Sequence, residues 1–277
     1  MDPDEYCRQK AAASGSSFYY SFLFLPPERR RAITALYAFC REVDDVVDEC
    51  TDEQVARTKL AWWRVEVGKL YRGEPEHPVT RALHPFLAPF GLREQHLVEI
   101  IAGMEMDLTQ SRYLDFAGLE RYCYHVAGAV GLLAAAIFGY TNPRTLDYAK
   151  DLGTAFQLTN IIRDVGEDAR KNRIYLPMDE LKRFEVPAAD ILQSRTSENF
   201  LRLMRFQSER ARRFYSKAFE ALPDEDRKSQ AAGLIMAAIY RATLEEVERD
   251  GFKVLTQRTS LTPIRKLWIA WNTWVAL

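Results

Sequence analysis

The sequence predicts an all-α fold, and three observations support this prediction. Apolar residues recur at helical spacing from one end of the 277-residue chain to the other. Strand signals are almost absent, because no segment sustains a period-two alternation of apolar and polar residues. Hydrophobic residues make up 47% and charged residues 28% of the chain, which is the balance of a folded globular protein rather than a disordered one.

The predicted helices follow from this periodicity and from the residues that interrupt it. Helix-breaking residues occur at Pro26-Pro27, Gly73-Glu74-Pro75, Gly91, Asn142-Pro143 and around 173–177. The expected ranges are 3–14, 27–49, 52–72, 78–90, 93–109, 115–139, 143–169, 178–184, 188–192, 196–221, 223–248 and 261–276. No linker, repeat or low-complexity tract separates them, so we expect one domain over residues 1–277.

Charge and cysteine content exclude several classes of function. The formal charge of −1 provides no overall attraction to nucleic acid, and no nucleic-acid partner is expected. Cys7, Cys40, Cys50 and Cys123 have neither the spacing of a metal site nor that of a disulfide framework. The N-terminus is acidic where a signal peptide would be basic, so a reduced, cytoplasmic setting is expected.

Two apolar segments raise the question of membrane contact. No apolar run reaches the ~18 residues that span a bilayer, and the run at 128–140 predicts a buried core helix. The C-terminal segment 267–277 carries Trp268, Trp271 and Trp274. These residues fit either a last helix packed on the core or an interfacial contact with the inner face of a membrane. Peripheral membrane attachment therefore stays open.

Two of the predicted helices, 27–49 and 143–169, each carry a polar stripe in otherwise apolar surroundings. The first stripe is Tyr37, Arg41, Asp44 and Asp48, and the second is Gln157, Asn160, Asp164 and Asp168. At ~100° per residue, each set falls on a single helix face. Because isolated buried carboxylates are very costly, each stripe must be either solvated or compensated.

Three kinds of compensation are open for these carboxylates. The stripes could face water, pair with arginines, or face each other across a cavity and hold divalent cations. Two stripes of matching form favour the third, since Mg²⁺ binds a few carboxylates and leaves positions for phosphate oxygens. Arg41 and Arg163 lie beside the carboxylates and suit bidentate phosphate contact. Gly166, inside the second stripe's helix, permits either a close approach or a kink.

Three sequence blocks, 37–48, 122–131 and 157–168, resemble the squalene/phytoene synthases, which join two prenyl diphosphates head to head. Segments 14–22 and 25–31 are most similar to the presqualene diphosphate synthases of the bacterial hopanoid pathway. The resemblance covers nearly the whole chain. It implies the isoprenoid-synthase fold, a helical bundle around a deep central cavity, and dependence on Mg²⁺, with Mn²⁺ as a substitute.

The resemblance also implies roles for individual residues. The implied metal ligands are Asp44, Asp48, Asn160, Asp164 and Asp168. The implied catalytic residues are Tyr37, Arg41, Tyr122, Arg163 and Tyr240. The implied substrate-binding residues are Ser17, Phe18, Phe22, Val126, Ala127, Val130, Gln157, Asn160 and Arg258. Of these, Val126, Ala127 and Val130, together with Ala134, are expected to form the floor of the substrate pocket.

The implied reaction converts two farnesyl diphosphates to presqualene diphosphate and diphosphate, without NADPH. One allylic diphosphate leaves, the double bond of the second substrate attacks, and loss of a proton to Tyr122 or to the departed diphosphate closes a cyclopropane. The alternatives are phytoene, dehydrosqualene or complete squalene synthesis, a class I terpene cyclase and, outside enzymes, a non-catalytic helical assembly factor. The sequence leaves the choice between C15 and C20 substrates and the oligomeric state open.

Overall fold

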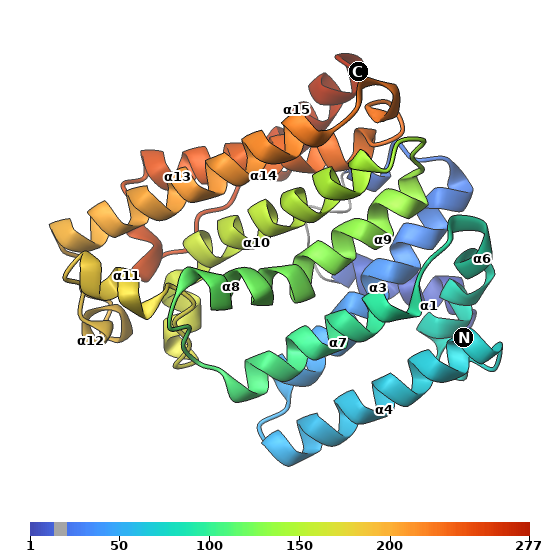
Figure 1. The fold of residues 1–277 in the computed structure, drawn as a ribbon, viewed down its shortest axis with the longest axis horizontal. Helices are drawn as coiled ribbons and strands as arrows, with labels where there is room; N and C mark the ends of the chain where they lie inside the picture. Colours follow the sequence, from blue (N-terminus) through green and yellow to red (C-terminus); the bar gives the residue numbers. More distant parts are fainter. Residues whose placement is uncertain (14–20) are drawn as a thin grey trace.

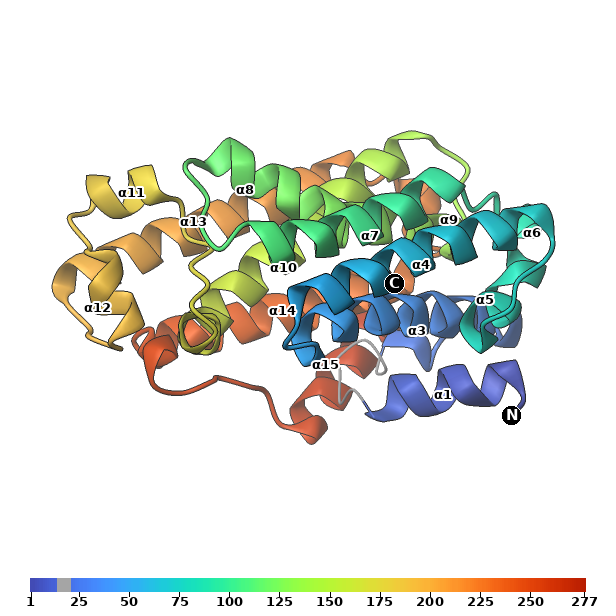
Figure 2. The same ribbon diagram turned by 90° about the horizontal axis from the view of Figure 1, so that it is seen from below.

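Long helices occupy most of the chain in the computed structural model, which describes residues 1–13 and 21–277 (Figures 1 and 2). The α-helices are α1 Pro3–Ala13, α3 Pro27–Glu49, α4 Glu53–Arg72, α5 Pro78–Leu83, α6 Leu87–Phe90, α7 Glu94–Thr109, α8 Phe116–Cys123, α9 Ala129–Phe138, α10 Arg144–Arg170, α11 Met178–Arg183, α12 Ala188–Leu192, α13 Glu198–Ala221, α14 Ala231–Arg249 and α15 Pro263–Val275. In the described ranges, strand-like pairing is limited to one isolated bridge between Arg112 and Ile174. The all-α prediction is therefore confirmed.

Helix α10 runs through the middle of the bundle and organises its core (Figure 1). It packs against α9 and α13 and also contacts α14. The helices α1, α4 and α7 pack with α3 into the second part of the bundle, which meets α9. Since α3 and α10 carry the two polar stripes, their placement on the two parts of the bundle decides whether the stripes meet.

Two predicted helices are divided in the structure. The predicted helix 78–90 is broken by a 3₁₀ turn, His84–Phe86, at Pro85, whose ring removes a backbone donor. The predicted helix 223–248 begins instead as the 3₁₀ turn Asp224–Asp226, and α14 starts only at Ala231. The Asp226 carboxylate accepts hydrogen bonds from the backbone N–H groups of Thr141 and Asn142, at 2.7 and 3.0 Å. These contacts fix the turn to the loop before α10.

The predicted helix 115–139 is continuous but contains a π-helical turn, η2 (Tyr124–Gly128), between α8 and α9. This helix, Phe116–Phe138, is long and apolar enough to cross a membrane, so the expectation that no segment qualifies is wrong by this criterion. A core helix meets the same criterion, and 44% of the tested window is buried. Its contacts with α7 and α10 place it in the core of the bundle.

Glycines allow this helix and α10 to approach closely. A Cβ added to Gly131 would lie 2.3 Å from the carbonyl oxygen of Ala149, and one added to Gly153 would lie 2.4 Å from that of Ala127. Both distances are far inside van der Waals contact, so neither position accepts a side chain without backbone movement. The close approach puts the wall residues of η2 and α9 directly beside α10.

Candidate active site

A cavity of about 910 Å³ brings the two polar stripes together. It is lined by all eight stripe residues and by Tyr122, Arg163, Tyr240 and Arg258. The stripes therefore face a common space, as the third kind of compensation requires. Ser17 and Phe18 lie outside the described residues, and nothing follows for them.

The first stripe is compensated mainly by basic side chains. Arg41 pairs with Asp44 on the same helix, at 2.5 Å. Asp48 pairs with Lys171 at 3.0 Å and with Arg173 at 3.4 Å, both from the segment after α10. Burial raises the pKa of Asp44 to about 6 despite the nearby arginine, and the charge of Asp48 adds to the increase. In the first stripe, Asp48 is therefore the well-paired carboxylate, because two cations contact it. Asp44 is the incompletely compensated one, because its pKa stays raised beside Arg41.

The second stripe divides its charge differently. Asp164 pairs with Arg163 at 2.5 Å and with Arg258 at 2.9 Å. Burial opposes its ionisation, but these two arginines hold the pKa of Asp164 below its usual value. Burial and the neighbouring Asp164 charge raise the pKa of Asp168 to about 7. Among the described residues, Asp168 forms no ion pair.

The donor set fits a hard divalent cation, although no closed metal cluster is formed. Within residues 1–13 and 21–277, no three His, Cys, Asp or Glu side chains are grouped to hold a metal. However, the Oδ1 atom of Asn160 is buried and has no hydrogen-bond partner among the residues that the structure describes. This amide oxygen and the weakly compensated Asp44 and Asp168 line one cavity. Carboxylate and amide oxygens are ligands that Mg²⁺ accepts.

The cavity mouth also gathers positive charge. Burial, together with the charges of Arg163 and Arg258, lowers the pKa of Lys266. These three cations line the same cavity as Arg41. Cations brought close enough to disfavour each other's charge form a site that an anion stabilises. The mouth therefore has the electrostatic character of a binding site for phosphate groups.

Sequence reasoning missed a network behind Tyr122. The Tyr122 hydroxyl donates to Asp107 Oδ2 at 2.9 Å, and the Tyr175 hydroxyl donates to Asp107 Oδ1 at 2.7 Å. The two tyrosine rings stack with their centroids 5.2 Å apart. Burial raises the pKa of Asp107 although both hydroxyls oppose this effect. No distinct signal in the sequence pointed to Asp107, because the helix 93–109 also contains Glu94, Glu99 and Glu105.

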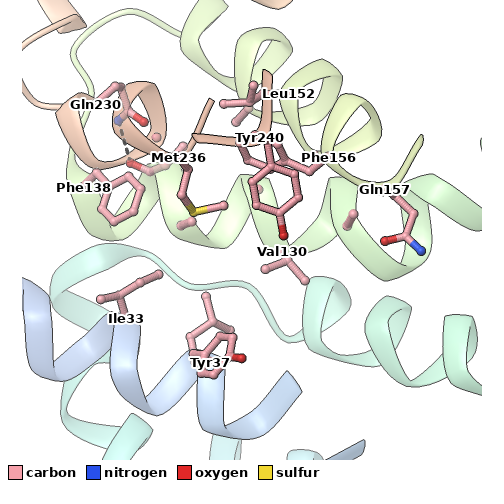
Figure 3. A pocket seen from close by; sticks show the side chains of 18 of the residues that line it. Ile33, Tyr37, Val130, Phe138, Leu152, Phe156, Gln157, Gln230, Met236 and Tyr240 are labelled. Carbon is pink, nitrogen blue, oxygen red and sulfur yellow. Dashed lines mark hydrogen bonds between the residues drawn. The ribbon is translucent and has the colours of Figure 1, made fainter. Parts of the chain in front are cut away.

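An apolar pocket of about 140 Å³ borders the polar cavity (Figure 3). The two spaces share Tyr37, Val126, Val130, Gln157, Asn160 and Tyr240. Figure 3 shows Tyr37 and Tyr240 directed toward the pocket from opposite sides, with Val130 between them. Phe22 and Ala127 line this pocket as well.

The four residues predicted as the pocket floor, Val126, Ala127, Val130 and Ala134, all line the apolar pocket. Val126 and Val130 lie where the pocket meets the polar cavity, and therefore form the junction rather than the floor. Phe138 and Met236 line the apolar pocket but not the polar cavity and are buried, so they are candidates for the end of the pocket away from that cavity. Sequence reasoning missed Met236 because it comes from α14, far along the chain.

Known proteins resemble this chain over nearly its whole length. Residues 11–265 match the family described as squalene/phytoene synthase. A phytoene synthase from Arthrospira platensis is 38% identical, covering 96% of this chain and 90% of that protein. A chloroplastic phytoene synthase from Narcissus pseudonarcissus is 34% identical over 96% of this chain, which spans 64% of that relative.

Solved structures show the same fold. A dehydrosqualene synthase crystallised with a ligand superimposes with a TM-score of 0.87 and 27% identity, covering 99% of this chain and 96% of that one. A squalene synthase from Alicyclobacillus acidocaldarius gives a TM-score of 0.80 and 26% identity, covering 90% of this chain and 94% of that one.

Proposed function

Because the chain belongs to the squalene/phytoene synthase family, we propose that it joins two farnesyl diphosphates head to head into presqualene diphosphate and diphosphate. The observation that carries the proposal is the common cavity of the two aspartate stripes, bordered by an apolar pocket. Charged groups at the mouth suit the diphosphates, and the apolar pocket suits a prenyl chain. This arrangement pairs a site for the leaving group with a dry site for the carbon chain.

The mouth residues would bind the diphosphates. Asp44, Asp48, Asn160, Asp164 and Asp168 are the residues that would hold Mg²⁺, or Mn²⁺ in its place. When bound, the ion supplies charge neutralisation for the departing diphosphate. Arg41, Arg163 and Arg258 are paired with carboxylates, and we infer that they turn to phosphate oxygens when substrate and cation enter. Gln157, which lines both spaces, would orient the head of the substrate.

The residues below the mouth would stabilise the allylic cation left by the departing diphosphate. Tyr37 and Tyr240 line the junction, and the ring of Phe22 lies 6.5 Å from that of Tyr37. Aromatic faces stabilise a desolvated cation by about 2 kcal/mol or more without forming a bond to it. Val126, Ala127 and Val130 supply the apolar wall that keeps water away.

Asp107 gives Tyr122 a route for the proton that is lost when the cyclopropane closes. Since the Tyr122 hydroxyl donates to Asp107, its oxygen keeps a lone pair for a second proton. As the new carbon–carbon bond forms, that oxygen takes the substrate proton and passes its own proton to the carboxylate. The raised pKa of Asp107 favours this transfer.

A second candidate is phytoene synthesis from two geranylgeranyl diphosphates. It is favoured by the similarity to phytoene synthases, which reaches 38% identity. The two candidates differ in the length of chain that the apolar pocket accepts. Phe138 and Met236 line that pocket beyond the junction. Their bulk supports the shorter farnesyl chain.

The test is a product assay with purified protein, Mg²⁺ and no NADPH, with farnesyl and geranylgeranyl diphosphate supplied separately. We expect presqualene diphosphate to accumulate from farnesyl diphosphate, identified by mass spectrometry after phosphatase treatment. A product formed only from geranylgeranyl diphosphate would establish the second candidate instead. Squalene appearing once NADPH is added would show that the reaction does not stop at presqualene diphosphate. Chelation of Mg²⁺ should abolish turnover in either case.

A further inference from the structure

The apolar pocket contains a hydroxyl group that has no hydrogen-bond partner. Tyr148 lines this pocket and is 1% exposed, and its Oη atom is buried without a partner among the described residues. Burial raises the pKa of Tyr148, so the hydroxyl stays a neutral donor. Because an unpaired buried hydroxyl is costly, its presence indicates a polar partner that binds from the pocket.

This hydroxyl lies against the first turn of α14. A Cβ added to Gly233 would lie 2.7 Å from the Tyr148 Oη atom, so a larger residue at this position would displace the hydroxyl. Gln230 precedes Gly233 by three residues, which puts the two positions on one face of the helix, roughly 5–6 Å apart. Both residues line the apolar pocket. The Tyr148 hydroxyl and the Gln230 side chain are therefore neighbours.

The Gln230 side chain supplies an unused acceptor. Its Nε2 atom donates to the backbone oxygens of Ala135 and Gly139, at 3.2 and 2.9 Å. These bonds fix the amide, and no described residue donates to its Oε1 atom. Figure 3 shows Gln230 beside Phe138, at the end of the pocket away from Gln157. An unused donor and an unused acceptor thus lie at the end of the pocket that is farther from the polar cavity.

We propose that Tyr148 and Gln230 hold an ordered water molecule at this end of the pocket, and that the water limits the length of the prenyl chain. The water would accept a hydrogen bond from the Tyr148 hydroxyl and donate one to Gln230 Oε1. Two polar partners and a pocket of about 140 Å³ meet the requirements of a buried water molecule, whose share of liquid volume is about 30 Å³.

The water would discriminate between two chains by what the end of each chain must displace. A farnesyl chain that stops short of the water leaves both hydrogen bonds intact. A geranylgeranyl chain is one isoprene unit longer, and its end would expel the water and leave Tyr148 and Gln230 facing hydrocarbon. Buried polar groups that lose their partners disfavour binding more strongly than a small loss of apolar contact does. This consequence rests on the proposed function, whereas the water site itself does not.

A crystal structure of the full chain without substrate locates the water directly. We expect one ordered water within about 3.2 Å of both Tyr148 Oη and Gln230 Oε1. A direct hydrogen bond between the two side chains, or no density between them, would overturn the proposal.

The stability of two Tyr→Phe variants tests the same site in solution. Tyr148→Phe should lower the midpoint of thermal unfolding by roughly 2–4 °C, because it removes a hydrogen bond to the water. The matched control is Tyr215→Phe, since Tyr215 is a buried tyrosine outside the pocket lining whose hydroxyl lies 2.9 Å from Thr159 Oγ1. This variant should show a decrease of the same size. A higher midpoint for Tyr148→Phe would overturn the proposal, since the hydroxyl would then have had no partner to lose.

Chain selection is tested with unreactive thiolodiphosphate analogues of farnesyl and geranylgeranyl diphosphate, whose binding is measured by calorimetry with Mg²⁺. We expect Tyr148→Phe to raise the ratio of C20 to C15 affinity about tenfold, and Tyr215→Phe to leave this ratio unchanged. An unchanged ratio in Tyr148→Phe would overturn the role of the water in chain selection. Binding of neither analogue by the unchanged protein would contradict the proposed function and with it the chain selection, whereas the unfolding midpoints would still decide whether the water is bound.

Discussion

The two aspartate stripes have the same D-x-x-x-D spacing but different electrostatic surroundings. In the first, Asp48 receives its cations from Lys171 and Arg173, more than a hundred residues away, while Asp44 pairs with Arg41 of its own helix. In the second, Asp164 holds Arg163 and Arg258, and Asp168 forms no ion pair among the described residues.

Each stripe therefore contains one carboxylate whose charged form is disfavoured by burial, Asp44 in the first stripe and Asp168 in the second. Burial raises the pKa of Asp44 to about 6 and that of Asp168 to about 7. Such strain persists at sites where a ligand later compensates it. In the second stripe, we infer that the two carboxylates have separate roles, because Asp164 holds two arginines whereas Asp168 is left to receive the cation.

The largest expected effect is on turnover. Asp44→Asn and Asp164→Asn should each lower kcat/KM for farnesyl diphosphate by about 10³-fold, because each removes a charge that organises the leaving diphosphate. The measurement is release of diphosphate under saturating Mg²⁺. Circular dichroism should report an unchanged fold for both variants.

Asp45 offers a matched control within the first stripe's own sequence block. It pairs with Lys10 of α1 at 2.8 Å and also with Arg41, and it is absent from the cavity lining. Asp45→Asn should stay within about fivefold of the unchanged protein, the range of a partly exposed ion pair. A loss as large as that of Asp44→Asn would contradict the assignment of the cavity carboxylates.

The stripes could be predicted from the sequence because helical spacing is a local property. The partners of these carboxylates could not. Arg173 reaches Asp48 across 125 positions of the chain, and Asp107 reaches Tyr122 from a different helix. Such contacts depend on how the helices pack against one another. The spacing of apolar residues along the chain does not carry that information. The turn at Asp226 was missed for the same reason, since its hydrogen bonds go to the loop before α10.

Gly166 is a further case in which packing decides between two sequence-based alternatives. An added Cβ would lie 2.4 Å from the carbonyl oxygen of Leu255 and 2.5 Å from that of Val254. The glycine therefore permits Val254 and Leu255, in the segment after α14, to lie against α10. Leu255 is three residues before Arg258. That approach is what lets Arg258 reach Asp164 at 2.9 Å.

A smaller effect than that of the aspartates is accordingly expected for Gly166→Ala. The methyl group must displace backbone that positions Arg258, so turnover should fall roughly tenfold to a hundredfold. The matched control is Gly118→Ala in α8, where an added Cβ has its nearest neighbour at 3.5 Å. This control should keep full activity and gain up to about 1 kcal/mol of stability from the better helix former. Full activity in Gly166→Ala would show that the position of Arg258 does not affect the reaction.

The smallest expected effect is on stability in metal-free buffer. Asp168→Asn and Asp164→Asn should change the free energy of unfolding in opposite directions. A carboxyl whose pKa in the folded state exceeds its unfolded value of 3.8 destabilises the fold as pH rises toward 7, and its full cost is present above that pH. Asp168→Asn should therefore stabilise the protein at pH 8 by about 2 kcal/mol, after discounting for solvent screening. At about pH 3 the change should be close to zero, because below the unfolded pKa of 3.8 Asp168 is protonated in both the folded and the unfolded state.

Asp164→Asn should act in the opposite direction, because its pKa is lowered and its charge stabilises the fold above the unfolded pKa. Removing that charge also leaves the largely buried Arg163 without its closest partner, which costs about 2 kcal/mol or more at pH 8. Thermal unfolding with EDTA measures both variants, and shifts of a few degrees in opposite directions are expected. If both variants shift the same way, the two members of the second stripe share one electrostatic role, and the cation need not prefer Asp168.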